Sequence, residues 1–569
     1  MYSKPFLSKA TAVLSRAVPR RIRPVHALLL VIIISVVFLS RPNHHAKKSS
    51  PLPNIYTYTD GKTSRPWSEL LLPNRVPPET AWLNEVVESA GLPRDVRYYS
   101  VRIKPQLNDT RPTVSHVDAP FMFGGFRGIR SDHEGLRLQA EHTIPVPIAP
   151  GTPMAAVNAG PLLFGISTSF ARVTRDDDAI ITDWTRWLTN GDGKTNGASL
   201  VLTLRQADDR QVEIVKEKLE KAGIDALVSG EDAEDSPTRY LDLIRQLTVR
   251  TNAKGFENSA DKKYLAVLDD DTFFPDVAEL LKRLEKFDAN EEHYIGLPSE
   301  RADWVADPDE TVTFGGGAVF FTPPAAVKVS QLPCLGTGGA DDDGTNGTSS
   351  AEQDNQRLGY TSQWDHLLYD CVSNYTQLTM HVLPSFYLPS DEKFGSYFFD
   401  YDLGIAPLAL HRTRNRHLLD PGKATAISPL LNPQTFLQRY RFSDDWVLVN
   451  GHTLSHYPRG SSTAALGSPA VHKDDYENRY KKMKPLNSNL AIEEEGRDPR
   501  GWDVVTWAGS RRIWNLIEAR RDLEKNEVWH AYARRKGDPG EFTDRRRNED
   551  RAGSDYVIVL IWEGLEKEE

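Results

Sequence analysis

Three consecutive aspartates occur three times in this 569-residue sequence, at 176–178, 269–271 and 341–343. Only the run at 269–271 directly follows an apolar stretch, YLAVL (264–268). It leads into TFFPDVAELLKRLEKF, which has the apolar spacing of an amphipathic helix and Pro275 near its first turn. The other two runs lie in polar or Gly-rich surroundings, which is typical of solvated acidic loops. The triplet 269–271 is therefore the one that we expect to be held rigidly.

Three carboxylates at one strand end repel one another unless a cation neutralises them. Oxygen ligands favour hard ions such as Mg²⁺ or Mn²⁺, so we expect Asp269 and Asp271 to hold such an ion against a nucleoside diphosphate. A phosphohydrolase of the haloacid-dehalogenase type also places Asp after a strand. Its pattern needs Thr four positions after the first Asp, where this sequence has Phe273, and Thr272 comes one position too early. We therefore rank that class below transfer from a nucleotide sugar.

Short apolar segments alternate with helix-forming segments from Ala156 onward. The expected strands are PLLFGIST (161–168), SLVLTL (199–204), DALVSG (225–230) and YLAVL (264–268), and the expected helices are DWTRWL (183–188), VEIVKEKLEKAG (212–223) and TRYLDLIRQL (238–247). This alternation predicts an α/β domain with a mostly parallel sheet and helices on both faces. Ligands of such sheets bind at the carboxyl ends of the strands, where the triplet lies.

The apolar run VHALLLVIIISVVFLS (25–40) contains no Asp, Glu, Lys or Arg and follows several Lys and Arg residues. It is shorter than the roughly 20 residues of a usual bilayer span, but a thinner early-secretory membrane tolerates a shorter one. The positive-inside rule places the N-terminus in the cytosol and the rest of the chain in the lumen. A cleaved signal peptide is the alternative. We expect a single-pass type II anchor in the Golgi or endoplasmic reticulum membrane.

Changes in composition divide the chain into six expected parts. These are a cytosolic tail (1–24), a transmembrane signal anchor (25–40), a stem rich in Pro, Ser, Lys and His (41–77), an N-terminal extension (78–155), a catalytic domain (156–435) and a small β-rich C-terminal region (436–569). In the last part, WVLVNGHTLSHYP and YVIVLIWEG have the character of strands.

Composition excludes two kinds of site. The formal net charge of −10 and a pI of about 5.9 argue against a broad nucleic-acid surface, which needs a basic face. Two cysteines, Cys334 and Cys371, are too few for a cysteine-based zinc site. In an oxidising lumen the two can pair, and two free buried thiols are the alternative.

Several segments occur in an order that resembles one enzyme family. YLAVLDDDTFF, YIGLPSE (294–300), FGGGAVFF (314–321) and WDHLLYDC (364–371) resemble the fringe-related branch of glycosyltransferase family 31, in particular its fungal members. The resemblance covers roughly residues 155–420. It implies a Rossmann-like GT-A fold and an inverting enzyme. Such an enzyme moves a hexose or N-acetylhexosamine from a UDP-sugar to a glycan or glycoprotein hydroxyl, commonly as a β-1,3 linkage, with Mn²⁺.

The resemblance also implies roles for individual residues. Asp269 and Asp271 bind the metal, and Asp270 lies beside the ribose and phosphates. His411, in PLALHRTRNRH, is a further metal ligand. The run Gly315-Gly316-Gly317 resembles the family's glycine turn, where backbone can approach a sugar or pyrophosphate closely. An ordinary tight turn is the alternative for these glycines.

Three further assignments leave competitors open. An inverting transfer needs a general base, and Asp365 in QWDHLLYDC matches the family's position best. Asp370 is its competitor, and capping of a helix N-terminus is the ordinary structural role for Asp365. His417 is the alternative to His411. Arg172, after the first strand of the α/β domain, is a candidate nucleotide contact or a surface arginine.

A second hypothesis from another class is a catalytically silent, lumenal carbohydrate-binding protein on the same fold. A lectin needs neither three converging carboxylates nor a separate base. The triplet therefore favours catalysis.

Overall fold

The computed structural model describes residues 78–110, 112–133, 139–176, 178–231, 236–252, 262–297, 317–333, 364–383, 401, 407–465, 490–492, 503–507, 509–538, 541–542 and 554–565. All of them belong to one compact unit, Asp60–Glu569. The expected tail, anchor and stem (1–77) lie outside these residues. Within the described ranges, no helix is both long enough and apolar enough to cross a membrane.

The first of two large sheets has eight strands in the order β18-β12-β10-β11-β8-β5-β6-β7. They are β5 (Leu162–Ser169), β6 (Ser199–Arg205), β7 (Asp225–Glu231), β8 (Tyr264–Leu268), β10 (Tyr294–Leu297), β11 (Ala318–Phe321), β12 (Met380–Val382) and β18 (Leu490–Ile492). β8, β5, β6 and β7 run parallel, whereas β11 is antiparallel to both β8 and β10. The predicted alternation of strands and helices is confirmed, and the chain has a mixed α/β fold.

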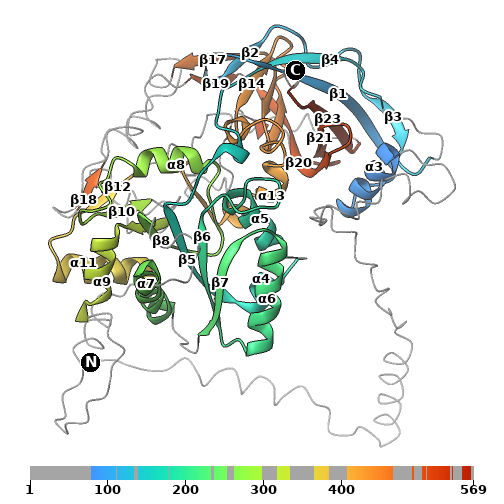
Figure 1. Ribbon diagram of the computed structural model, residues 1–569. Coiled ribbons are helices and arrows are strands. Elements are labelled where there is room, and N and C mark those ends of the chain that lie inside the picture. The colour runs from blue at the N-terminus through green and yellow to red at the C-terminus, as the bar shows by residue number, and fades with distance from the viewer. Residues whose placement is uncertain are drawn as a thin grey trace, which may run out of the picture. The chain divides into compact units, whose positions relative to one another are not determined.

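Helices cover both faces of this sheet (Figure 1). On one face lie α4 (Phe170–Val173), α5 (Ala179–Leu188), α6 (Asp209–Lys221) and α8 (Val277–Leu284), and on the other α7 (Ser236–Asn252), α9 (Pro323–Ser330) and α11 (Trp364–Tyr375). Side chains alternate along β5, so Phe164 packs in the first core and Leu163 in the second. A Cβ at Gly165 would lie 2.9 Å from a methyl of Leu247, so the glycine lets α7 approach β5 closely.

Two helices begin at residues that cap them locally. The Asp208 carboxylate accepts the backbone N–H of Gln211, whose side chain accepts the backbone N–H of Asp208 in return. The Asp276 carboxylate accepts two N–H groups of the first turn of α8, at 3.0 and 3.2 Å. Pro275 thus precedes this cap instead of opening the helix. Each cap contributes about 1 kcal/mol to stability.

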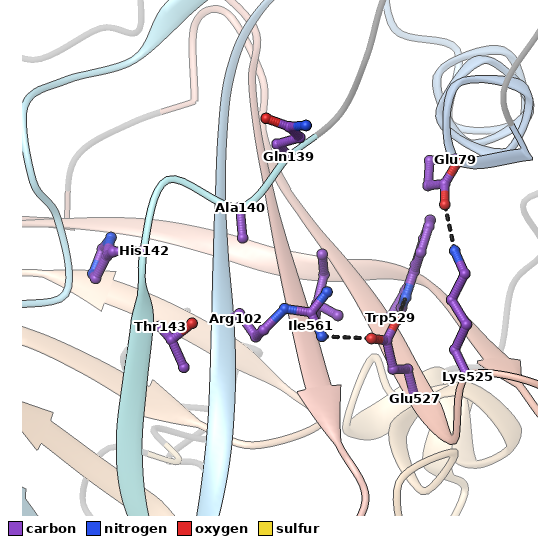
Figure 2. A pocket seen from close by; sticks show the side chains of 10 residues that line it. All are labelled: Glu79, Arg102, Gln139, Ala140, His142, Thr143, Lys525, Glu527, Trp529 and Ile561. Atoms are coloured by element: carbon purple, nitrogen blue, oxygen red, sulfur yellow. Dashed lines mark hydrogen bonds and ion pairs between the residues drawn. The ribbon is translucent and has the colours of Figure 1, made fainter.

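The second large sheet joins both ends of the described chain. Its strands are β1 (Asp95–Leu107), β2 (Ser115–Val117), β3 (Arg127–Arg130), β4 (Thr143–Ile148), β14 (Arg439–Phe442), β15 (Trp446–Val449), β16 (Thr453–His456), β20 (Ser510–Asp522), β21 (Glu527–Arg534), β22 (Glu541–Phe542) and β23 (Tyr556–Glu563). β1 pairs with β23 and β2 with β14. The regions 78–155 and 436–569, which the sequence suggested as separate parts, therefore share one sheet. Helix α3 (Pro78–Ser89) packs on one face, which also carries a polar cavity (Figure 2).

Short elements outside the two large sheets complete the fold. They are β9 (Thr272–Phe273), β13 (Leu410–His411), α12 (Thr413–Arg416), α13 (Pro421–Ala424), β17 (Ser461–Ala465), β19 (Asp503–Trp507) and the 3-10 turns Met154–Ala156 and Pro433–Thr435. Lys423 on α13 pairs with Glu518 on β20 at 2.9 Å. A Cβ at Gly451, whose φ is +78°, would lie 2.3 Å from the Ala424 carbonyl oxygen. The glycine therefore lets the turn after β15 pack directly on α13.

Candidate metal and nucleotide site

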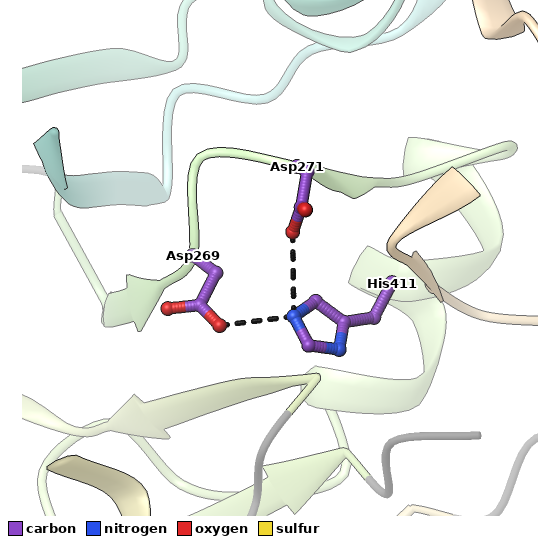
Figure 3. A group of neighbouring side chains, drawn as sticks. All are labelled: Asp269, Asp271 and His411. Atoms are coloured by element: carbon purple, nitrogen blue, oxygen red, sulfur yellow. Dashed lines mark hydrogen bonds and ion pairs between the residues drawn. The ribbon is translucent and has the colours of Figure 1, made fainter. Parts of the chain in front are cut away.

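Asp269, Asp271 and His411 converge directly after β8 (Figure 3). The His411 Nε2 atom lies 2.9 Å from Asp269 Oδ2 and 3.3 Å from Asp271 Oδ1. One ligand atom from each residue lies within 4.8 Å of the other two. The His411 side chain is 5% exposed, whereas those of Asp269 and Asp271 are 29% and 20% exposed. The imidazole is thus held inside the protein, and the carboxylates face solvent in part.

Backbone pairing brings His411 to the triplet across 142 residues of sequence. The two-residue strands β9 and β13 are antiparallel, with Thr272 opposite His411 and Phe273 opposite Leu410. Both Phe273 and Leu410 are buried in the core beneath this pair. The Thr272 hydroxyl also donates to the carbonyl of Gly317 at 3.0 Å. The residue after the triplet therefore holds it against two other segments.

The ligand set fits a hard divalent ion. An imidazole nitrogen this close to two carboxylate oxygens must carry a proton or share the space with a cation, because two unprotonated acceptors repel each other. Two carboxylates and one imidazole suit Mn²⁺, and carboxylates with water suit Mg²⁺. A metal ion that displaces the Nε2 proton would satisfy the same three atoms.

Two buried aromatic side chains orient Asp269. The Tyr240 hydroxyl and the Trp364 indole N–H donate to Asp269 Oδ1 at 2.8 and 2.9 Å. The two rings stack with their centroids 4.4 Å apart and their planes 9° apart. Burial acts to raise the pKa of Asp269. The contact with His411 and the two ring donors outweigh burial, so that pKa lies below its usual value. This carboxylate is therefore kept charged, with Oδ2 directed at His411.

Asp270 faces a different set of partners. Its carboxylate accepts the Arg172 Nε–H at 2.6 Å and a short hydrogen bond from the Thr168 hydroxyl. A second guanidinium nitrogen of Arg172 lies 3.2 Å from Asp271 Oδ2. The structure thus joins Arg172 to the triplet, and 39% of its side chain remains exposed toward solvent. Arg172 partly offsets the negative charge of two of the three carboxylates.

Asp271 has a pKa above its usual value. Burial is the main cause, and the neighbouring carboxylates Asp270 and Asp269 add to it, while His411 and Arg172 act in the opposite direction. The three aspartates thus experience three environments, although their sequence is uniform. The pKa of Asp269 is lowered and that of Asp271 is raised.

Helix α11 carries the base candidate. Its first residue, Trp364, contacts Asp269, so the start of the helix is docked at the triplet. Asp365 follows directly and is buried in the first turn, where its carboxylate accepts the backbone N–H of His366 at 3.0 Å. Its competitor Asp370 lies more than one helical turn further on and contacts His366 Nδ1 at 3.2 Å. The structure therefore places Asp365 nearer the triplet along the helix than Asp370.

The predicted glycine turn and the two cysteines are placed only in part. Gly315 and Gly316 lie outside the described residues, and Gly317 donates its N–H to the Leu297 carbonyl at 3.2 Å. Cys371 is disulfide-bonded, and Cys334 lies outside the described ranges. The predicted glycine turn as a whole thus remains a prediction.

The segment that follows His411 is held by a partly buried ion pair. Arg414 makes two contacts with the carboxylate of Asp183 on α5, one of them at 3.0 Å. Asp183 Oδ1 also accepts the Gly422 N–H at 3.2 Å. His417, the alternative to His411, instead contacts the Tyr401 hydroxyl through Nδ1. The structure brings His411 and not His417 to the triplet.

Sequence reasoning missed Tyr240, Thr168 and Asp183. Tyr240 lies in a helix whose apolar spacing marks it as a core residue, and it is in fact buried. Its hydroxyl reaches Asp269 only because α7 packs beside β8. Thr168 is the one with a usable signal, because it lies near the carboxyl end of β5, beside the strand that carries the triplet.

No protein-family model and no curated protein matches this chain. Parts of it are similar to solved structures. One is S. aureus TarS 1–349 in complex with UDP-GlcNAc, at 10% identity and a TM-score of 0.17, with 24% of this chain and 34% of that chain covered. Another is galactosyltransferase LgtC with donor and acceptor sugar analogs, at 12% identity and a TM-score of 0.23, over 36% of this chain and 69% of that chain.

A third is mouse xyloside xylosyltransferase 1 in its apo form, at 12% identity and a TM-score of 0.21, over 37% of this chain and 81% of that chain. The chain thus spans about a third of the TarS chain that it matches.

Proposed function

We propose that this protein is a metal-dependent glycosyltransferase that uses a nucleoside diphosphate sugar. The observation that carries the proposal is the convergence of Asp269, Asp271 and His411 after the parallel strand β8. In doubly wound sheets, ligands bind at this edge. A site with two carboxylates and one imidazole is suited to a divalent cation that binds a diphosphate.

The proposed reaction replaces one C–O bond with another. The oxygen of an acceptor hydroxyl attacks the anomeric carbon, the bond from that carbon to the diphosphate breaks, and the nucleoside diphosphate leaves with the electron pair. A divalent ion held by the three ligands would stabilise the charge on that leaving group. Arg172, which contacts both Asp270 and Asp271, adds a positive charge beside the triplet.

Asp365 is the proposed base that takes the proton of the acceptor hydroxyl. Its place beside Trp364, whose indole contacts Asp269, supports this role. An inverting transfer needs one such base. Asp370 is the alternative. The turnover of Asp365→Asn and Asp370→Asn variants distinguishes the two aspartates.

The resemblance to fringe-related enzymes supports the finer parts of the proposal. These are a GT-A fold, an inverting mechanism, UDP as the nucleotide, Mn²⁺ as the ion, transfer of a hexose or N-acetylhexosamine, and a β-1,3 linkage to a glycan or glycoprotein. The apolar run 25–40 supports a type II anchor with the catalytic domain in the Golgi or endoplasmic reticulum lumen.

A hydrolysis assay tests the proposal directly. The purified protein is incubated with UDP-galactose, UDP-GlcNAc or UDP-glucose, and release of UDP is measured with Mn²⁺ and with EDTA. We expect release from one of these donors with Mn²⁺, and its loss with EDTA and in Asp271→Ala. Activity that survives both chelation and the substitution would exclude the metal site.

The alternatives give different results in the same assay. A phosphohydrolase that cleaves the diphosphate would release UMP and the sugar 1-phosphate and not UDP. A silent carbohydrate-binding protein would bind sugars but release none of these products with any of the three donors.

A further inference from the structure

The polar cavity on the second sheet is built by elements that contribute nothing to the metal cluster. Its volume is about 330 Å³, and its walls come from α3, β1, β4, β21, β23, the residues before β4 and the turn before β21. Figure 2 shows these side chains directed into one space beside α3. The same face of the sheet is apolar under α3, where Trp82, Tyr98 and Val557 pack. The face thus changes from core to polar cavity along its strands.

Strand register explains how the floor of the cavity is formed. Thr143 on β4 is paired with Arg102 on β1, Arg102 with Ile561 on β23, and Ile561 with Trp529 on β21. Paired residues in a sheet point to the same face. The four side chains therefore form one row across four adjacent strands, and all four line the cavity.

The charged groups of the cavity are matched with one another. One Arg102 guanidinium nitrogen lies 2.5 Å from Glu527 Oε1 and 3.2 Å from Glu563 Oε1. Glu527 and Glu563 are direct cross-strand partners, so Arg102 offsets the repulsion of two like charges. Lys525 pairs with Glu79 at 2.5 Å. In the lining, two cations thus face two carboxylates, and Arg102 also contacts Glu563 outside the lining. No charge is left uncompensated for a phosphate or another anion.

We propose that this cavity is a second binding site, specific for a neutral sugar residue. Hydroxyl groups both donate and accept hydrogen bonds, so a sugar can use the carboxylate acceptors and guanidinium donors that line the walls. Ile561 and Ala140 supply an apolar surface for the C–H face of a pyranose ring. The volume lies at the small end of ligand sites, which span roughly 300–1,000 Å³, and so fits one or two sugar units.

The proposed sugar site does not rest on the proposed glycosyltransferase activity. It needs neither a metal ion nor a nucleotide, because none of its residues belongs to the cluster at Asp269. Such a site would hold a glycan chain on the second sheet independently of turnover.

Binding of free sugars by the full-length protein tests this site. Glucose, galactose, mannose and N-acetylglucosamine are titrated in EDTA, without nucleotide, and followed by saturation-transfer NMR. We expect at least one of these sugars to bind the wild-type protein and the Asp271→Ala variant equally. Ala140→Trp, which fills the cavity, is expected to abolish binding. Thr143→Ala removes one exposed hydroxyl and should weaken binding about fivefold, as for one lost hydrogen bond.

Gln106→Ala is the matched control, because this residue is an exposed part of β1 outside the cavity. It should bind as the wild type does. If none of the four sugars binds, or if binding is unchanged in Ala140→Trp and Thr143→Ala, the proposal is wrong. Competition by inorganic phosphate at millimolar concentration would also overturn it, because it would identify an anion site. UDP release in the Mn²⁺ assay is read separately, so failure of either proposal leaves the other standing.

Discussion

The two large sheets present their polar side chains in different ways. In the eight-stranded sheet, the key carboxylates follow the end of one strand, and all three come from one tripeptide. In the eleven-stranded sheet, the polar row lies across a face, and Arg102 contacts carboxylates 425 and 461 residues away in sequence. Parallel strands gather functional groups at one edge, whereas pairing of distant strands gathers them on a face. A local motif can therefore reveal the first site but not the second.

The two regions also differ in charge balance. At the triplet, three carboxylates face Arg172 and the imidazole of His411. On the second sheet, each cation of the cavity already has a carboxylate partner. On the proposed function, a bound cation would complete the first region, whereas the second needs none. Removal of metal should affect only the first.

The largest expected effect is on the metal cluster. Asp271→Asn keeps the shape of the side chain but removes a charge that faces His411. We expect Mn²⁺-dependent UDP release to fall on the order of 10³-fold, as when a group that stabilises developing charge is lost. Steady-state UDP release with saturating Mn²⁺ measures this.

Asp192→Asn is the control for that substitution, because Asp192 is an exposed aspartate of the same α/β region. It should retain full activity. Equal losses in both variants would show a general effect of charge and not a metal ligand. A normal rate in Asp271→Asn would contradict the assignment.

A smaller loss of activity is expected when Asp365, the proposed base, is replaced. Asp365→Asn should lower turnover about 10²-fold, since general-base catalysis typically contributes at least this much. Nucleotide affinity should stay unchanged, because the triplet is intact. Transfer rates and UDP binding by calorimetry are measured on the same preparation.

Asp370→Asn on the same helix is the matched control. If Asp370→Asn loses turnover and Asp365→Asn does not, the two roles are exchanged. If neither loses turnover, the base lies elsewhere.

The second sheet should respond to pH through His530 on β21. Burial lowers the pKa of His530 to about 3, against an ordinary value of 6.5. Within the described part of the chain, neither ring nitrogen has a hydrogen-bond partner. The unfolded chain binds the proton more readily than the folded one, so folding stability falls as pH drops below 6.5. At pH 5 the free energy of unfolding is about 2 kcal/mol lower than at neutral pH because of this histidine.

Thermal or urea unfolding at pH 5.0 and 7.5 checks this value in wild type and in His530→Leu. The variant should lose the part of the pH dependence that comes from His530, while its UDP release at neutral pH stays intact. An unchanged difference between the two pH values would contradict the assignment.

The smallest effect on activity is expected from a change in the stacked pair of Tyr240 and Trp364. Trp364→Phe keeps a ring against Tyr240 but removes the N–H that donates to Asp269. We expect the Mn²⁺ affinity to weaken about fivefold, since one hydrogen bond contributes about 1 kcal/mol. Activity as a function of Mn²⁺ concentration measures the change. Binding of free sugars at the cavity on the second sheet should be unaffected.

Much of the α/β region could be predicted because its signals are local. YLAVL is entirely buried as β8, and the capping residues Asp208 and Asp276 begin α6 and α8. Apolar period and caps act within a few residues, so they are visible in a single sequence. The position of the triplet at a strand end followed from the same signals.

Other parts could not be predicted, because they depend on pairing between distant segments. The sequence favoured His411 and left His417 as the alternative, and the two-residue pairing of β9 with β13 is what brings His411 to the triplet. Tyr240 has the spacing of a core residue, and only the packing of α7 directs its hydroxyl to Asp269. Likewise, nothing local indicates that β1 pairs with β23.

The sequence by itself determined the strand–helix alternation and singled out Asp269–Asp271 among three identical runs, because apolar periodicity and the flanking strand are properties of neighbouring residues. Only the tertiary structure decided which histidine joins the triplet, which donors hold each aspartate, and that the two ends of the chain share a sheet. The physical reason is that hydrogen bonds and ion pairs act over a few ångströms. Their partners are set by packing, whatever their separation along the chain.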